Sequence, residues 1–346
     1  MQVKKNKKKY LFLLLFLLMA SFVIPLPYFI EMPGSAEDIS EHVRVNQKKD
    51  EQPGSFMLTT VYVKQGTIAT LASSYFNPNR EIVSKKEMMG GSNSKEYNQM
   101  QKYYMESSQN LASKVALDLT DKPYKMAYKG VYVMSVMENS DFSGKLSVGS
   151  TITGINGKKM KTSAEFIEYV QSQKVGDSVT LTVDEESGEK EVTGKLIQLE
   201  ETKKTGIGIS LVDHTELVSD EKIEFMTDDI GGPSAGLMFT LQLYSMLSGE
   251  DIRHGLEIAG TGTIDSEGVV GRIGGIDKKV IAAENAGAEI FFAPDDEITD
   301  DMKKADPKIK TNYQEAVESA KRNKLKLKIV PVKTVQDAIN YLEKRK

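Results

Sequence analysis

The chain has 346 residues, 40% hydrophobic and 27% charged, so it is long enough for two or three domains and is not disordered over most of its length. Its net charge of −4 provides no general basic surface for nucleic acid. The absence of cysteine excludes disulfides and thiolate nucleophiles, and the three histidines lack the spacing of a helical zinc motif. We expect no metal site and no cofactor.

The N-terminus combines a lysine cluster with an apolar run. Residues 4–9 hold five lysines, and an uncharged run from Tyr10 to Ile30 follows. Because a helix of ~20 residues crosses a bilayer, residues 10–30 are predicted to be a single-pass transmembrane anchor. The basic tail 1–9 then lies in the cytoplasm and everything after the anchor lies outside the cell membrane. A cleaved signal peptide is the alternative, but the apolar run continues well past the small residues Ala20 and Ser21.

Residues 31–122 are predicted to form a neck that packs against the domains after it. Glu31 to Gly54 is polar and is expected to be a linker or a loosely ordered neck. Ser55 to Val63 is β-branched and aromatic between glycines, which predicts a strand. Apolar residues recur at helical intervals from Tyr97 to Leu117, which predicts a helix.

Residues 123–200 are predicted to form a compact β-rich unit. The strand GVYVMSV precedes a hairpin signal at Asn156-Gly157, a helix that begins with the capping pair Thr162 and Glu165, and two further strands. This order resembles a bacterial PDZ domain, whose carboxylate-binding loop is matched by Gly130, Val131, Tyr132 and Val133. The resemblance implies that the loop amides hold a peptide C-terminus while the peptide adds as a strand. A spacer without a ligand is the alternative.

Residues 205–346 alternate strand-like and helix-like segments, which predicts an α/β or α+β domain. Strands are expected at 207–211, 256–264, 269–273, 289–292 and 325–332, and helices at 233–247, 277–286, 313–322 and 334–344. Ser234 stands at the start of the first of these helices, within Gly-Pro-Ser-Ala-Gly. It could be a helix cap or a nucleophile.

A nucleophilic serine needs a base. The segment also fits G-x-S-x-G, the nucleophile elbow of hydrolases, but His254 is the only histidine after Ser234 and is expected at the surface. A lysine can act as the base if desolvation removes its proton. Lys278 and Lys279 follow Gly274-Gly275 and precede an apolar helix, although two exposed lysines are the simpler reading.

These motifs together resemble the Lon-type serine-lysine protease domain. Residues 232–236 match its G-P-S-A-G motif, Thr261-Gly262 its T-G strand, and Gly274 to Lys279 its G-G-x-x-x-K motif. The resemblance implies that Ser234 and Lys279 are catalytic, that Thr261 supports the lysine, and that Gly231, Gly232, Pro233 and Ala235 form the oxyanion loop. Gly231 and Thr263 depart from the family, which usually has Asp and Glu there.

The whole chain resembles the membrane-anchored PDZ-Lon proteases of Gram-positive bacteria. The expected fold is therefore multi-domain: an N-terminal transmembrane helix, a PDZ-like domain and an α/β (α+β) Lon-type protease domain at 205–346. Because the sequence has no G-x-x-x-x-G-K-[ST] segment, we expect ATP-independent cleavage of extracellular or membrane-proximal peptides or proteins. Two alternatives are a cell-surface scaffold whose PDZ-like unit binds peptide C-termini and whose Lon-like domain is inactive, and a signal-peptidase-like enzyme. The oligomeric state is left open.

Overall fold

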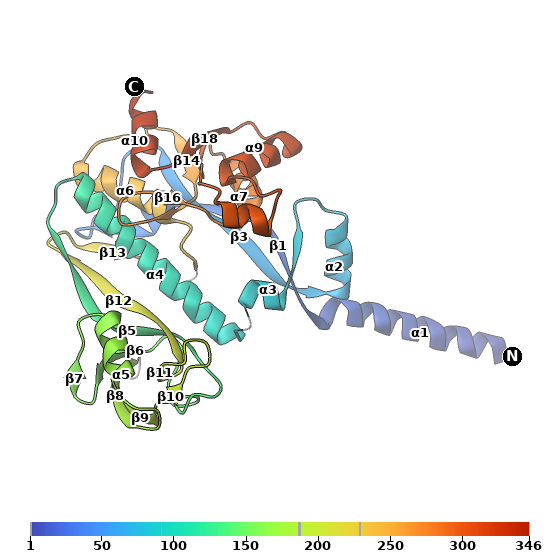
Figure 1. Cartoon of the computed structure of the whole chain (residues 1–346). Coiled ribbons are helices and arrows are strands. Elements are labelled where there is room, and N and C mark those ends of the chain that lie inside the picture. Colours follow the sequence, from blue (N-terminus) through green and yellow to red (C-terminus); the bar gives the residue numbers. More distant parts are fainter. Residues whose placement is uncertain (1, 91, 186–187, 228–229, 346) are drawn as a thin grey trace.

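The computed structural model describes residues 2–90, 92–185, 188–227 and 230–345. It contains two bodies, each built on a sheet, and the long helix α4 (Ser94–Leu119) lies between them (Figure 1). The first body holds the N-terminal strands together with the C-terminal part of the chain. The second is formed by the middle of the chain.

The first body is a mixed sheet of strands from both ends of the chain. In spatial order the strands are β18 (Lys328–Val332), β17 (Ile290–Pro294), β14 (Glu257–Gly260), β3 (Ser55–Thr67), β1 (Pro25–Asp38) and β4 (Glu81–Ser84). The pairs from β18 to β3 are parallel, whereas β1 runs antiparallel to both β3 and β4. The N-terminal strands thus complete a sheet that the C-terminal segment begins.

Helices cover both faces of this sheet because its strands are apolar on both sides. Phe56, Ile258 and Phe292 face a core shared with α4, α6 (Gly236–Ser248) and α10 (Val335–Glu343). The alternate residues Met57 and Phe291 face a second core shared with α7 (Ile276–Asn285) and α9 (Asn312–Asn323). The period of two in a strand produces this division between the faces.

The second body is a smaller antiparallel sheet covered by α5 (Ser163–Gln171). Its order is β12 (Ile209–Ser219), β5 (Tyr124–Val136), β6 (Thr151–Ile155), β8 (Ser178–Glu185) and β9 (Gly188–Lys195), with β7 (Lys158–Lys159) beside β6. Phe166 and Val170 of α5 pack on Val131, Leu181 and other inward residues of the strands. The sheet extends past the predicted boundary at residue 200, because β12 pairs with β5 over its whole length.

The remaining elements are short. They are η1 (Ile39–Glu41), α2 (Ile68–Tyr75), α3 (Lys85–Met89), α8 (Asp300–Ala305) and the strand pairs β2 (Val43–Val45) with β13 (Ile223–Phe225), β10 (Ile197–Gln198) with β11 (Thr205–Gly206), and β15 (Thr263–Ile264) with β16 (Val270–Gly271).

The predicted transmembrane anchor at 10–30 is wrong. Helix α1 (Gln2–Val23) ends before Pro25, and the rest of the apolar run enters the sheet as β1. Within the described residues no helix combines the length and the apolar character that a membrane crossing requires. We therefore withdraw the transmembrane helix from the predicted fold class. We also withdraw the predicted location, a single-pass membrane protein with a cytoplasmic N-terminus.

The linker predicted from Glu31 to Gly54 is also wrong in its first half. Residues up to Asp38 belong to β1, which pairs with β3 from Pro25↔Thr67 to Asp38↔Met57. The sequence did not indicate a strand here because the segment is polar. Its side chains Glu31 and Glu37 line a cleft and do not enter a core. The predicted helix at 97–117 is confirmed and extends further at both ends.

An ion pair buried in the first body fixes the segment before β3 against α6. Arg253 Nη2 lies 2.7 Å from Asp50 Oδ2, and the two side chains are 1% and 5% exposed. Gln242 of α6 donates to the same Asp50 oxygen at 2.6 Å, and the Arg253 guanidinium lies over the ring of Phe56. This cluster ties the N-terminal strands to the helix that follows Ser234.

Replacing Asp50 with alanine should therefore destabilise the fold strongly, since it leaves the Arg253 charge buried without its partner. Such a loss typically costs about 3–5 kcal/mol. Equilibrium unfolding in urea would measure it. Asp301→Ala is the matched control, because its pair with Lys304 is exposed and such pairs contribute little. Equal midpoints for the two variants would contradict this role of the buried pair.

Candidate active site

The loop before α6 places Ser234 just ahead of the N-terminus of that helix. Ala235 is the N-cap and makes no side-chain capping bond, so the cap interpretation of Ser234 is wrong. Gly232 has φ of 89°, a conformation that favours glycine. A Cβ at Gly236 would come within 2.9 Å of the backbone nitrogen of Ile264. The glycines therefore let the loop turn and let α6 approach β15 closely.

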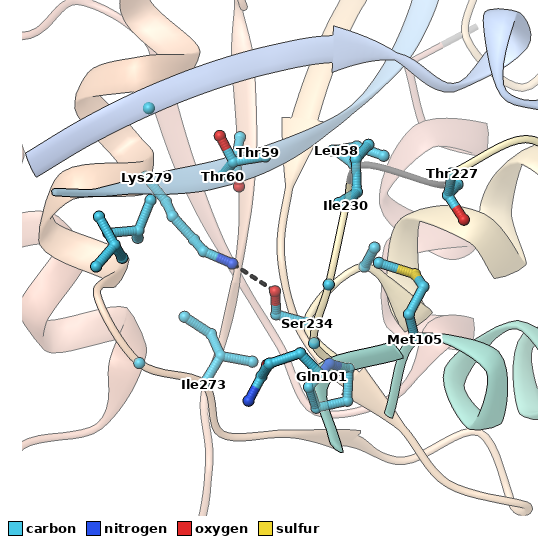
Figure 2. A pocket seen from close by; sticks show the side chains of 18 of the residues that line it. Leu58, Thr59, Thr60, Gln101, Met105, Thr227, Ile230, Ser234, Ile273 and Lys279 are labelled. Carbon is cyan, nitrogen blue, oxygen red and sulfur yellow. Dashed lines mark hydrogen bonds between the residues drawn. The ribbon is translucent and has the colours of Figure 1, made fainter. Parts of the chain in front are cut away.

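Lys279 reaches this serine from helix α7. The helix starts after Gly275, which has φ of 69°, and both lysines lie in its first turn. Lys279 Nζ lies 2.6 Å from Ser234 Oγ (Figure 2). The same nitrogen lies 3.1 Å from Thr261 Oγ1. The side chain is 4% exposed. Ser234 and Lys279 are 45 residues apart in the chain, and the fold brings them into contact.

Thr261 connects the two residues. Its hydroxyl donates to the Ser234 carbonyl at 3.0 Å, and the amide of Gly262 donates to the same oxygen at 2.9 Å. Thr261 itself is fully buried. The threonine therefore contacts the lysine amine with its oxygen and holds the serine backbone with its proton.

Burial lowers the pKa of Lys279 to about 7, because desolvation disfavours the charged amine. In the part of the chain that the structure describes, no acidic group offsets this effect. A substantial fraction of the amine is therefore neutral near neutral pH, which a general base requires.

The adjacent Lys278 behaves in the opposite way, although it is also buried, at 2% exposed. Its ammonium lies 2.6 Å from Glu81 Oε2 and 3.2 Å from Asp277 Oδ1. Burial acts to lower its pKa, but the bond and charge of Glu81 together with Asp277 raise it. The alternative in which both lysines are exposed is therefore wrong, and of the two only Lys279 lacks an acidic partner among the described residues.

The serine and lysine lie in a cleft of about 1790 Å³ between the sheet and α4. Thr59 and Thr60 of β3 line one side, and Gln101 and Met105 of α4 line the other (Figure 2). Sequence reasoning missed these residues, since nothing in a helix or strand pattern indicates which polar positions meet a distant loop. His254 is exposed, as expected.

Helix α4 explains the departure at Gly231. A Cβ at this position would come 2.9 Å from the Cβ of Gln101, so a larger residue would collide with the helix. The main-chain N–H of Gly232 donates to the Gln101 carbonyl at 2.9 Å, and Ser108 Oγ donates to the Pro233 carbonyl at 3.1 Å. The loop that carries Ser234 is thus packed directly on α4.

The predicted peptide-binding residues Gly130, Val131, Tyr132 and Val133 lie inside strand β5 and are buried. Strand β12 pairs with them on one edge, and β6 pairs with Val131 and Tyr132 on the other. They are far along the chain from Ser234 and do not line its cleft. Their role in binding a peptide stays a prediction. Among the described residues, no group of three His, Asp or Glu side chains is placed to hold a metal.

Comparison with known proteins agrees with this division of the chain. Residues 228–342 match the model of the Lon protease (S16) C-terminal proteolytic domain, and residues 113–196 match that of the PDZ domain. The Lon protease of Desulforamulus reducens is 43% identical over 65 residues, which cover 19% of this chain and 8% of that protein. The Lon protease of Anaeromyxobacter dehalogenans is 26% identical over 191 residues, which cover 53% and 22%.

Among solved structures, the PDZ domain of the SdrC-like protein from Listeria monocytogenes is 40% identical, with a TM-score of 0.25, and covers 25% of this chain and 93% of that one. The matched regions cover less than a quarter of the two curated Lon proteases. The family matches extend over both bodies, and they show that this chain carries a PDZ domain and the proteolytic domain of a Lon-type serine peptidase.

Proposed function

We propose that the chain is a peptidase in which Ser234 is the nucleophile and Lys279 the general base. The observation that carries this proposal is the 2.6 Å contact between Ser234 Oγ and an amine that burial keeps partly neutral, with no acidic partner among the described residues. A serine hydroxyl is a weak nucleophile until an adjacent base accepts its proton. Lys279 is the basic group within hydrogen-bond distance of it.

In the proposed reaction, Ser234 Oγ bonds to the carbonyl carbon of the scissile peptide while its proton passes to Lys279 Nζ. The ammonium then returns this proton to the departing amine as the C–N bond breaks. A water molecule, deprotonated by the same amine, hydrolyses the acyl-enzyme and restores the serine. Amides at the N-terminus of α6 stabilise the oxyanion, since the helix dipole places positive charge there.

The cleft suits an extended polypeptide. Strand β3 continues to Thr67, but its pairing with β14 ends at Leu58. Beyond Leu58 this edge of β3 has no strand partner among the described residues, and Thr59 to Val63 line the cleft. A substrate backbone can add to such an edge. The steps proposed here use no nucleotide, and the given sequence contains no phosphate-binding G-x-x-x-x-G-K-[ST] segment.

Alanine at either Ser234 or Lys279 should abolish cleavage of fluorescent casein, and the double variant should be no worse than the single ones. The two groups move one proton, so removing one already removes the relay. Lys278→Met is the matched control: it should lower stability, since Lys278 lies in an ion cluster, but keep the rate per folded molecule within about threefold. Turnover by Lys279→Ala close to that of the unchanged chain would refute the assignment.

The pH dependence follows from the lowered pKa of Lys279. Only the neutral amine accepts the serine proton, so kcat/KM should rise with pH and level off above a midpoint near the pKa of about 7. Circular dichroism across the same pH range would show that the loss at low pH is not unfolding. A midpoint above 9 would mean that the lysine is not desolvated in solution.

Thr261→Val should lower kcat about tenfold or more while KM changes little, because the amine loses the oxygen that orients it toward Ser234. Thr261→Ser keeps the hydroxyl and should stay near the unchanged rate. Steady-state kinetics on one peptide substrate would measure both. If the serine variant loses as much as the valine variant, packing of the methyl group rather than the hydrogen bond explains the effect.

A further inference from the structure

Helix α4 presents one face to the PDZ domain. Residues 99, 103, 106 and 110 recur at helical spacing and all contact the strand pair β5–β12. Their contacts are Gln99 Nε2 to the Tyr132 hydroxyl at 3.1 Å, the Tyr103 hydroxyl to the Asp213 carbonyl at 3.1 Å, Glu106 to His214 at 3.3 Å, and Asn110 Nδ2 to the Thr215 carbonyl at 3.1 Å. The rings of Tyr103 and Tyr132 lie 4.4 Å apart.

A second face of the same helix holds the catalytic loop. Residues 101, 105 and 108 also recur at helical spacing, and they lie against the segment that leads to Ser234. Gln101 accepts the amide of Gly232, Ser108 donates to the Pro233 carbonyl, and Met105 is buried in the core at the edge of the cleft. One rigid element therefore touches the PDZ strands and the serine loop within the same three turns.

Strand β12 fills the place where a PDZ domain would add a peptide strand. It runs antiparallel to β5 from Ile209↔Val136 to Ser219↔Tyr124 and so covers the edge of Gly130 to Val133. On its other side, β12 contacts helix α5 of the PDZ domain: the amide of Ser163 at the start of α5 donates to Asp213 Oδ1 at 2.8 Å. An added strand in such a groove gains main-chain hydrogen bonds. Here the chain provides that strand itself.

We propose that β12 is an internal occupant of the PDZ groove whose pairing fixes α4, and that Gln101 is the positioning residue through which α4 holds the Ser234 loop. A peptide strand that replaced β12 would remove the contacts of Tyr103 and Asn110. The loop at Gly232 would then lose its fixed support, and the reactivity of Ser234 would change.

The first test follows the backbone and does not depend on the proposed peptidase activity. Tyr103→Phe/Asn110→Ala, made in the full chain, removes the bonds to Asp213 and Thr215 on the PDZ side and leaves the serine loop unaltered. Hydrogen–deuterium exchange of peptides that contain the Gly232 amide should accelerate at least about threefold, since each lost bond is worth about 1 kcal/mol and part of it reaches the loop.

Two comparisons make the exchange experiment specific. Peptides from α9 should exchange at unchanged rates, which separates loosening of the loop from global unfolding. Lys95→Ala is the matched control, because Lys95 is exposed on α4 and makes no hydrogen bond or ion pair with the rest of the described chain. Exchange at the Gly232 amide that is the same in the double variant and in Lys95→Ala would overturn the coupling.

The second test addresses Gln101 and rests on the proposed function, because it reads the labelling rate of Ser234 by a fluorophosphonate probe. Gly231→Ala places a Cβ 2.9 Å from the Cβ of Gln101 and should slow labelling about tenfold by pushing the loop off α4. Gln101→Gly removes the opposing Cβ, so Gly231→Ala/Gln101→Gly should recover at least half of that loss. A loss that is the same with and without Gln101→Gly would refute the positioning role.

The outcomes separate the two proposals. If the unchanged chain is not labelled at Ser234, the nucleophile assignment fails, and the exchange experiment alone decides the coupling. If Ser234 is labelled and depends on Lys279, but neither exchange nor labelling responds to the α4 variants, the dyad stands and the coupling is wrong.

Discussion

The candidate site depends on one amine that is buried away from water and that has no carboxylate beside it in the described parts of the chain. Lys279 is buried beside Ser234, and its amine also contacts the hydroxyl of Thr261. Lys278, one position earlier on the same helix, instead forms ion pairs with Glu81 and Asp277. Successive helix residues point about 100° apart, so the two side chains leave the helix in different directions. The same first turn therefore produces a charged structural lysine and a partly neutral one.

That arrangement requires strands from the far end of the chain. Strand β4 supplies Glu81, which takes the charge of Lys278. Strand β3 packs against the start of α7. A Cβ placed on Gly275 would lie only 2.7 Å from Val61 Cγ2. The residues before 68 thus contribute strands to the first body, in which Lys279 lies. Without them the first turn of α7 would be open to water and the pKa of Lys279 would return toward its usual value.

The sequence predicted the local elements well and the long-range pairings poorly. Gly-Pro-Ser-Ala-Gly and the glycine pair before Lys279 were informative because backbone conformations that require glycine are local properties. The start of α6 was misplaced because Ser234 has the residue type of a cap while its hydroxyl faces the lysine. The apolar run after Tyr10 was wrongly predicted to be one membrane-spanning helix. Hydropathy alone does not show that the helix ends before Pro25 and that a strand begins there. The predicted helix at 97–117 contains Gln101, and the predicted strand at 207–211 overlaps β12, but nothing in the sequence indicated what these elements contact, since their partners lie more than 70 residues away in the chain.

Chain order adds a geometric constraint on the PDZ domain. It lies between α4 and α6, two helices that share one core, so both of its ends are anchored in the catalytic body. The ends leave together, because Tyr124 of β5 pairs with Ser219 of β12 at the point where the domain joins the body. A domain attached by a single linker can swing freely, whereas one attached by a paired ribbon transmits twist and displacement. An external strand would compete with β12, whose tether gives it a local concentration in the range of ~1 mM or more. Under the proposed coupling, only ligands that bind the groove tightly, or that the cleft itself holds close, could exchange with β12, and a polypeptide that contacts both the cleft and the PDZ domain would meet this requirement.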